Sequence, residues 1–430
     1  MNKNKIQEIV DKELDIRKSI EYKQTINIFD ITKSFIKRKG LMLYGGAALN
    51  ALVKDKFYKK HDLPDYDFIS YDAQKHAKEL ANLYGNAGYK YTEAKPGNHY
   101  GTYKVYASFV PVADITQIPK SLFLRMKKKA VYAKDLKLYT VPLDYLRMAI
   151  YIELSRPAGD ISRWSKIYER LQLFNKYHPV TKPRQNIYIK YNLNESLNQI
   201  LNVVKDFIIF KKLVIFGTYG FSQFVPQKNI EFSKLDKKMS FFDVLSLKAH
   251  DSIQELSTIL KNIGFHLDSK KQNIKSIKLF GSRAITKRSG LSSNEFFGTH
   301  FSLSYKNNLI INIFQTEACY SFFTHNNMRI ATIDTMLSFF YAFKFTTRDY
   351  INVDKVQFMI EHLFQLQKNN KLSKNIKFQR FGFECYGNQK TLIDLKKEKH
   401  QRIQSKNSKM KVYRPLVRST KKKVQELIYL

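Results

Sequence analysis

Two carboxylates separated by one residue mark the stretch of the chain best suited to chemistry. Asp65 and Asp67 stand in Asp65-Tyr66-Asp67-Phe68, whose alternation of polar and apolar residues predicts a strand. Side chains at i and i+2 of a strand point to the same face, so the two carboxylates lie side by side. Their repulsion is roughly several kcal/mol at an intermediate dielectric. A divalent cation would relieve it, and Mg²⁺ prefers carboxylate oxygens together with phosphates and water.

A glycine pair and a third acid complete the candidate site. Gly45 and Gly46 follow the apolar segment 41–44 and lead directly into a predicted helix. A polyphosphate can therefore approach bare backbone and the N–H groups of a helix N-terminus. Asp114 lies in a later apolar strand, 110–115. Carboxylates that hold two divalent ions are the usual apparatus of in-line phosphoryl transfer.

The order of these features resembles the polymerase-β-type nucleotidyltransferase superfamily: strand, Gly-Gly, helix, Asp-x-Asp, then a lone Asp on a distant strand. A second pattern, SRP-GD-SRW-K-Y-RL-LFN over residues 155–175, is similar to the poly(A) polymerase catalytic subunits of large cytoplasmic DNA viruses. Asfarviruses and mimiviruses have such enzymes, and the poxvirus ones are more distant. The gap between Gly46 and Asp65 is longer than in much of the superfamily, a loop that the viral branch tolerates.

The resemblance implies a two-metal nucleotidyl transfer with Mg²⁺ or Mn²⁺. Asp65 and Asp67 would bind both ions, whereas Asp114 would bind one and help to deprotonate the attacking hydroxyl. Gly45 and Gly46 would hold the triphosphate. ATP would be the nucleotide and an mRNA 3′ end the acceptor, although the residues themselves indicate only nucleotidyl transfer.

A basic helix is expected to flank the nucleotide. Arg163 and Lys166 lie at helical spacing in the segment 160–171, with Trp164 on the other side. In the family that the chain resembles, such a helix faces the nucleotide cleft, so Arg163 and Lys166 are candidate nucleotide-binding residues. A solvated basic face is the structural alternative.

The chain repeats its first domain in a form that has lost the chemistry. Segments of 205–345 follow the same order as those of 41–140, and three positions of the candidate site are replaced. The replacements are Thr218 for Gly46, Phe241 for Asp65 and Asn312 for Asp114. Only Asp243 remains, and one carboxylate cannot hold a metal pair. We therefore expect an α+β protein with two tandem polymerase-β-like nucleotidyltransferase domains, the second degenerate, and flanking helices.

This repeat divides the chain into five predicted parts. They are two N-terminal helices (1–40), the catalytic domain (41–140), a helical segment flanking the cleft (141–204), the degenerate domain (205–345), and a C-terminal helical region with a basic tail (346–430).

Composition points to a nucleic-acid partner. The chain has 430 residues, 43% of them hydrophobic, and a formal net charge of +37. Such an excess of cations favours a polyanion such as RNA. An AT-rich genome also enriches Lys, Asn, Ile, Phe and Tyr, which accounts for part of the excess but not for the scarcity of Asp and Glu.

Cysteine content and hydropathy predict an intracellular setting. Cys319 and Cys385 are too few and too far apart in sequence to suggest a disulfide framework or a zinc site. The N-terminus has no secretory signal and no segment is long and apolar enough for a membrane helix. A reducing compartment fits these features, and the viral resemblance implies the host cytoplasm, at the viral factory, and the virion.

Three functions remain compatible with the sequence. Poly(A) polymerase leads, with a homodimer or a processivity subunit as further partners. The enzymatic alternative is another transferase such as a terminal uridylyltransferase, a CCA-adding enzyme or a toxin-like transferase. The third is a non-catalytic RNA-binding subunit, against which the intact Asp65, Asp67 and Asp114 speak.

Overall fold

The computed structural model divides the chain into two units by its internal contacts. The first unit comprises Met1–Pro142 and Leu392–Leu430, and the second comprises Leu143–Thr391. The residues described are 3–59, 62, 65–180, 195–225, 241–265, 300–305, 308–316, 318–345, 351–370, 375–405 and 412–415. None of the helices in these ranges combines the length and the apolar character that crossing a membrane requires. The lysine run at 421–423 lies outside the described residues.

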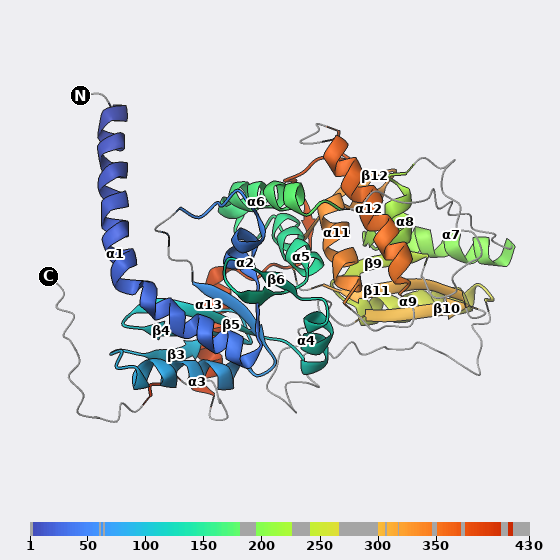
Figure 1. Ribbon diagram of the computed structural model, residues 1–430. Helices are drawn as coiled ribbons and strands as arrows, with labels where there is room; N and C mark the ends of the chain where they lie inside the picture. The colour runs from blue at the N-terminus through green and yellow to red at the C-terminus, as the bar shows by residue number, and fades with distance from the viewer. Residues whose placement is uncertain are drawn as a thin grey trace. The chain divides into compact units, whose positions relative to one another are not determined.

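The first unit is built on a sheet of seven described strands in the order β3-β4-β5-β2-β1-β7-β6. Figure 1 labels β3, β4, β5 and β6 of this sheet. These strands are β1 (Met42–Leu43), β2 (Tyr66–Ser70), β3 (Glu93–Pro96), β4 (Thr102–Ala107), β5 (Val110–Gln117), β6 (Val131–Ala133) and β7 (Leu138–Thr140). Along β4, Tyr103, Val105 and Ala107 are buried, whereas the side chains between them are only partly covered. One face of the sheet therefore belongs to the core and the other stays accessible.

Helix α1 (Lys3–Lys39) and helix α3 (Ala73–Asn86) pack on the sheet of the first unit. The helices of this unit are α1 (Lys3–Lys39), α2 (Gly45–Leu52), α3 (Ala73–Asn86), α4 (Lys120–Lys127) and α13 (Leu392–Gln404). The Tyr84 hydroxyl of α3 donates to the carbonyl oxygen of Ile28 in α1 at 2.6 Å and lies 2.7 Å from Thr32 Oγ1. This buried contact fixes α1 against α3.

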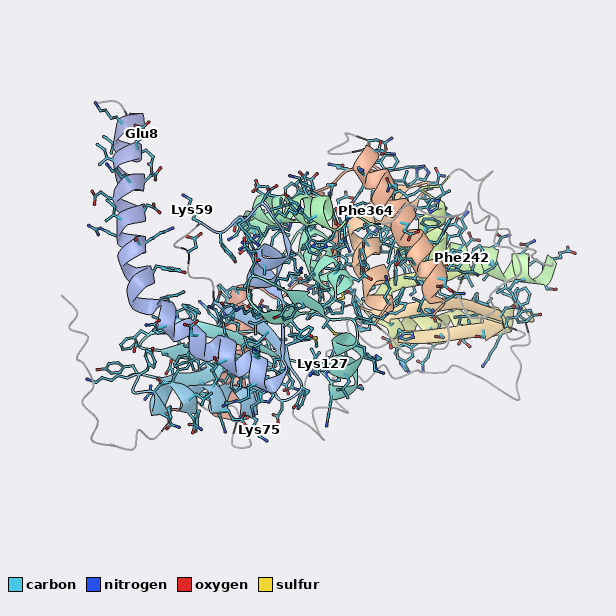
Figure 2. All side chains as sticks on the ribbon, in the orientation of Figure 1. Glu8, Lys59, Lys75, Lys127, Phe242 and Phe364 are labelled. Carbon is cyan, nitrogen blue, oxygen red and sulfur yellow. A yellow bond between two sulfur atoms is a disulfide. The ribbon has the colours of Figure 1, made fainter. Side chains whose placement is uncertain are left out.

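Helix α1 corrects the prediction of two N-terminal helices. No Gly or Pro interrupts the sequence from Lys3 to Lys39, so one helix of 37 residues forms and ends at Gly40, whose φ is +60°. Only its second half is packed: Ile36 is buried, whereas Ile9 is 55% exposed. Figure 2 labels Glu8 on the half that stands away from the sheet.

The C-terminal part of the first unit returns to the sheet edge. Tyr413 pairs with Ala94 of β3 through two backbone hydrogen bonds of 2.8 and 2.9 Å. The Tyr413 hydroxyl also donates to Asn82 Oδ1 at 2.6 Å, across 331 residues of sequence. The boundaries proposed from the sequence stay predictions, but these contacts join Tyr413 to the first unit.

The second unit contains a sheet of seven described strands in the order β10-β11-β9-β8-β13-β12-β14. The strands are β8 (Val214–Phe216), β9 (Phe242–Ser246), β10 (His300–Tyr305), β11 (Asn308–Gln315), β12 (Tyr320–His325), β13 (Met328–Ala331) and β14 (Cys385–Tyr386). The helical elements are α5 (Leu143–Leu154), η1 (Ile161–Arg163), α6 (Trp164–Tyr177), α7 (Glu195–Phe210), α8 (Gly217–Ser222), α9 (Ala249–Asn262), α11 (Ile333–Phe343) and α12 (Val353–Asn369).

The two sheets share one topology. Six strands follow the same order, β4-β5-β2-β1-β7-β6 in the first unit and β10-β11-β9-β8-β13-β12 in the second. Each pair of neighbours also runs in the same relative direction in both sheets. The register repeats as well, because Asp67 is opposite Asp114 and Asp243 is opposite Asn312. The predicted α+β architecture with two tandem related domains is confirmed.

A disulfide in the second unit corrects the expectation drawn from the cysteines. Cys319 and Cys385 are bonded, with their Cα atoms 5.2 Å apart. Strand β14 pairs with β12, where Ser321 is opposite Cys385, and this pairing carries Cys385 to Cys319. A sequence separation of 66 does not keep the two cysteines apart in space. The argument that the two cysteines are too far apart in sequence to suggest a disulfide was therefore wrong.

Candidate active site

A tight turn after β1 places the glycine pair beside a carboxylate. Strand β1 ends at Leu43, and Tyr44 stands at the start of α2 in an extended conformation. The Tyr44 N–H donates to the carbonyl oxygen of Asp67 at 2.9 Å. Gly45 has φ +70°, and a Cβ atom built on it would lie 2.3 Å from Asp67 Oδ2. Only glycine lets the backbone turn here and come so close to the Asp67 carboxylate.

We predict that Gly45→Ala lowers both stability and transfer activity. The left-handed backbone costs an L-residue about 1–2 kcal/mol, and the new methyl group displaces the Asp67 carboxylate. Gly217→Ala is the matched control, because Gly217 also has φ +70° and its Cβ would lie 2.1 Å from Asp243 Oδ2. Thermal unfolding should show a similar loss for both variants, whereas the transfer rate should fall only for Gly45→Ala. Equal losses of activity would contradict an active site confined to the first unit.

Two of the predicted carboxylates lie on neighbouring strands, and the third directly precedes one of these strands. Asp67 of β2 is the cross-strand partner of Asp114 of β5, in parallel register. Asp65 directly precedes β2, two residues before Asp67, and is half-buried as Asp67 is. Burial raises the pKa of Asp65, and the charge of Asp114 raises it further, while Lys104 acts in the opposite direction. The acids therefore share one electrostatic site.

Lys104 supplies the counter-charge in this arrangement. Its Nζ lies 2.5 Å from Asp114 Oδ2, and the Asp114 side chain is 17% exposed. Burial lowers the pKa of Lys104, but the hydrogen bond and charge of Asp114 outweigh burial and raise it overall. The other carboxylate oxygen, Asp114 Oδ1, is buried without a hydrogen-bond partner in the part of the chain that the structure describes. A buried carboxylate oxygen in that state is an available ligand atom.

The candidate ligands are of the chemical type that a hard divalent cation prefers. Asp65, Asp67 and Asp114 offer carboxylate oxygens, which Mg²⁺ and Mn²⁺ prefer. Within the described ranges, however, no three His, Cys, Asp or Glu side chains converge closely enough to hold one ion between them. Instead, the Lys104 ammonium contacts the Asp114 carboxylate.

The corresponding position in the second sheet is buried, and Asp243 is its only remaining acid. Asn312 replaces Asp114, donates to Asp243 Oδ1 at 2.8 Å and accepts from Ser302 at 2.5 Å. Asp243 and Asn312 are only 4% and 1% exposed. Phe241 occupies the position of Asp65 and packs on Tyr219, with ring centroids 5.6 Å apart. The contacts satisfy the remaining acid from within the protein and leave no cluster of carboxylates.

The predicted nucleotide-binding cations belong to the second unit. Arg163 ends η1 and Lys166 lies in the first turn of α6, and both side chains are exposed. Arg163 Nη1 lies 3.4 Å from Glu153 Oε2. Burial raises the pKa of Glu153, and Arg163 opposes that rise. Their role toward a nucleotide stays a prediction.

Sequence reasoning missed Lys104 and the polar pair beside it. The Tyr44 hydroxyl lies 2.8 Å from Thr116 Oγ1, and Thr116 is two residues after Asp114 on the same strand. Lys104 is the cross-strand partner of Asp114. The alternation of polar and apolar residues along 102–107 would have placed Lys104 on the polar face, but only the register brings it to Asp114.

Comparison with known proteins identifies relatives of this arrangement. Residues 30–160 match the family described as poly(A) polymerase catalytic subunit. A putative poly(A) polymerase catalytic subunit of Acanthamoeba polyphaga mimivirus is 24% identical over 315 residues, which cover 67% of this chain and 51% of that protein. One from African swine fever virus (strain Badajoz 1971 Vero-adapted) is 30% identical over 181 residues, 40% of this chain and 37% of that protein.

A solved structure extends the similarity to the fold of the whole chain. The crystal structure of the Megavirus polyadenylate synthase aligns with a TM-score of 0.73 and 19% identity, over 96% of this chain and 86% of that one. The resemblance inferred from the sequence is confirmed, and the fold is shared. The chain spans about half the length of the mimivirus relative.

Proposed function

We propose that this chain, whose residues 30–160 match the poly(A) polymerase catalytic subunits, is a template-independent poly(A) polymerase. It would transfer AMP from ATP to the 3′ end of an mRNA. One observation carries the proposal: the row of Asp67 and Asp114 beside the Gly45 turn is intact in the first unit. The same row in the second unit keeps only Asp243, because Asn312 stands where Asp114 would be.

The proposed reaction assigns a task to each residue of the candidate site in the first unit. Asp65, Asp67 and Asp114 would hold two Mg²⁺ or Mn²⁺ ions, which neutralise phosphate charge and lower the pKa of the attacking hydroxyl when bound. The backbone at Gly45 and Gly46 would face the triphosphate, because neither residue has a side chain that blocks close approach.

Bond changes follow from in-line displacement. The 3′ oxygen of the RNA forms a bond to the α-phosphorus, and the bond from that phosphorus to the bridging oxygen of the β-phosphate breaks. The hydroxyl proton passes to a carboxylate, for which Asp114 is the candidate, and pyrophosphate leaves with the electron pair of the broken bond. Lys104, which contacts Asp114 at 2.5 Å, holds that carboxylate in place before substrates arrive.

Further parts of the proposal concern partners and location. Arg163 and Lys166 would contact the nucleotide, and a homodimer or a processivity subunit would assist the enzyme. The relatives are viral proteins, so we infer a site of action in the host cytoplasm, at the viral factory, and in the virion.

An extension assay tests this function. Purified protein and a labelled RNA primer are incubated with each nucleoside triphosphate separately, in Mg²⁺ or Mn²⁺. We expect long ladders with ATP alone and none for the Asp65→Ala/Asp67→Ala variant. Incorporation of another nucleotide would replace the substrate assignment with a uridylyl-type or CCA-type transferase, and RNA binding without extension would favour a non-catalytic subunit.

A further inference from the structure

We propose that the first sheet binds the phosphates of the RNA strand that carries the attacking hydroxyl. The binding site lies on the side of the carboxylates that faces β4. The site is a group of cations, here called the lysine strip: Lys95 of β3, Lys104 of β4, and Lys399 and Arg402 of α13. The inference rests on the proposed function and locates the entry of its second substrate.

Strand register carries the lysine strip up to the carboxylates. Lys95 is the cross-strand partner of Lys104, and Lys104 is the partner of Asp114. Asp114 in turn is opposite Asp67. Four neighbouring strands thus present one row of residues, and the usual strand spacing puts the Cα atoms of Lys95 and Asp114 about 10 Å apart.

Helix α13 is fastened beside this row by Arg402. Its Nη2 donates to the carbonyl oxygen of Asn98 at 3.0 Å, and its guanidinium carbon lies 5.1 Å from the centre of the Tyr100 ring. Asn98 and Tyr100 belong to the loop between β3 and β4. Lys399 lies one helical turn before Arg402 on the same helix, and the charges of Lys95 and Lys104 act on it.

The charges that act on Lys399 are those of other cations. Burial lowers its pKa, and the charges of Lys95, Lys104 and Arg402 lower it further. Lys95 pairs with Glu93 and Lys104 pairs with Asp114. No carboxylate pairs with Lys399 among the residues that the structure describes. A half-buried ammonium group held against like charges is compensated when an anion binds there.

The sheet order assigns this anion to the RNA and not to the triphosphate. The carboxylates of β2 and β5 lie between β4, which carries Lys104, and β1, which leads to Gly45. In-line displacement needs the attacking oxygen and the leaving pyrophosphate on opposite sides of the α-phosphate. With the triphosphate at the Gly45 turn, the RNA 3′ end approaches from the side of the lysine strip.

The second unit provides a comparison within the same chain. The counterpart of Lys104 is Ser302, which is opposite Asn312 as Lys104 is opposite Asp114. Strand β10 is the last described strand on that side, so a counterpart of Lys95 is missing from the described sheet. The row with both carboxylates, Asp67 and Asp114, therefore has a lysine next to it, whereas the row that keeps only Asp243 has Ser302 at that position.

Charge reversal at Lys399 tests the lysine strip. Lys399→Glu is compared with Lys397→Glu, which makes the same charge change on an exposed residue of the same helix. Residues two apart do not share a helix face. Binding of a fluorescent single-stranded RNA is measured by anisotropy without divalent ions, over a range of salt concentrations. We expect about tenfold weaker binding for Lys399→Glu, with a smaller salt dependence, and less than a twofold change for Lys397→Glu.

Further readouts separate the possible outcomes. The Tm of Lys399→Glu should not fall, because the substitution removes a like-charge contact, and Lys399→Gln gives a neutral version of the test. In extension assays the KM for RNA should rise while the KM for ATP stays unchanged. Equal RNA binding by both Glu variants would overturn the proposal, as would a rise in the ATP KM alone. Because binding is measured without catalysis, failure of extension by the wild type would count against the proposed function only.

Discussion

Asp67→Asn and Asp114→Asn are each expected to lower the rate of RNA extension about a thousandfold, or about 4 kcal/mol of transition-state stabilisation. Each substitution keeps the shape of the side chain and removes the charge that would hold a divalent ion. Asp67 and Asp114 are cross-strand partners, so either loss breaks the same row. Single-turnover extension with a labelled primer and ATP measures the effect, and circular dichroism checks that the variants fold.

Asp243→Asn in the second unit is the matched control. Asp243 has the position that Asp67 has in the first sheet, and its Oδ1 accepts a hydrogen bond from Asn312 that an amide oxygen can also accept. The extension rate should stay within about twofold of the wild type. A large loss at Asp243, or activity retained in both first-unit variants, would show that the transfer chemistry lies elsewhere.

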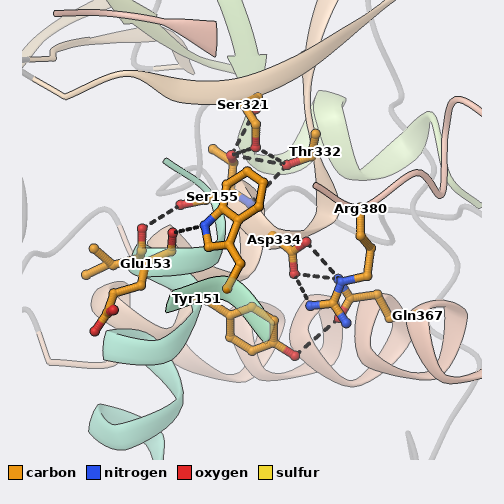
Figure 3. Close-up of polar contacts among 11 residues, drawn as sticks. Tyr151, Glu153, Ser155, Ser321, Thr332, Asp334, Gln367 and Arg380 are labelled. Carbon is orange, nitrogen blue, oxygen red and sulfur yellow. Dashed lines mark hydrogen bonds and ion pairs between the residues drawn. The ribbon is translucent and has the colours of Figure 1, made fainter. Parts of the chain in front are cut away.

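Arg380→Ala is expected to destabilise the second unit by about 3–5 kcal/mol, because it leaves a buried carboxylate without its partner. The Arg380 guanidinium donates to both oxygens of Asp334, at 2.6 and 3.1 Å, and the two side chains are 7% and 5% exposed (Figure 3). Gln367 adds a hydrogen bond to Asp334 Oδ1 at 2.7 Å and accepts one from the Tyr151 hydroxyl at 3.2 Å. The network joins α5, α11 and α12 to the segment that follows.

Urea denaturation followed by fluorescence measures this loss, since Trp164 lies in the second unit and contacts Phe381 with ring centroids 5.3 Å apart. The double variant Asp334→Leu/Arg380→Met is the control, because replacing both partners by apolar groups of similar volume leaves no unpaired charge. Most of the stability should return in it. A loss below about 1 kcal/mol in Arg380→Ala would mean that water reaches Asp334 and compensates it.

The elements that carry the candidate residues were largely predictable because they depend on short-range patterns. The two-residue period of a strand placed Asp65 and Asp67 together, and an apolar strand around Asp114 offered the third acid. Pairing of the two halves of the chain position by position predicted that Asn312 would replace that acid, and the register of β9 and β11 places it so.

Contacts between distant segments could not be predicted in the same way. Cys385 meets Cys319 through the pairing of β12 with β14, and nothing in the intervening sequence specifies that pairing. Lys104 meets Asp114 through a strand register that depends on the packed face of the whole sheet. The N-terminal error has a local cause, since helical periodicity along residues 1–40 does not show whether one helix or two carries it. A continuous backbone helix needs no buried face along its entire length.

The pairing of Tyr413 with Ala94 has a consequence for biosynthesis. During translation β3 emerges early, and its outer edge offers unpaired N–H and C=O groups until residue 413 leaves the ribosome. The second unit, Leu143–Thr391, is continuous in sequence and is complete before that moment. At that stage the second unit of the nascent protein is complete and the first is not. A chain cut short before Tyr413 would keep this strand edge open, and an open edge favours association with other chains.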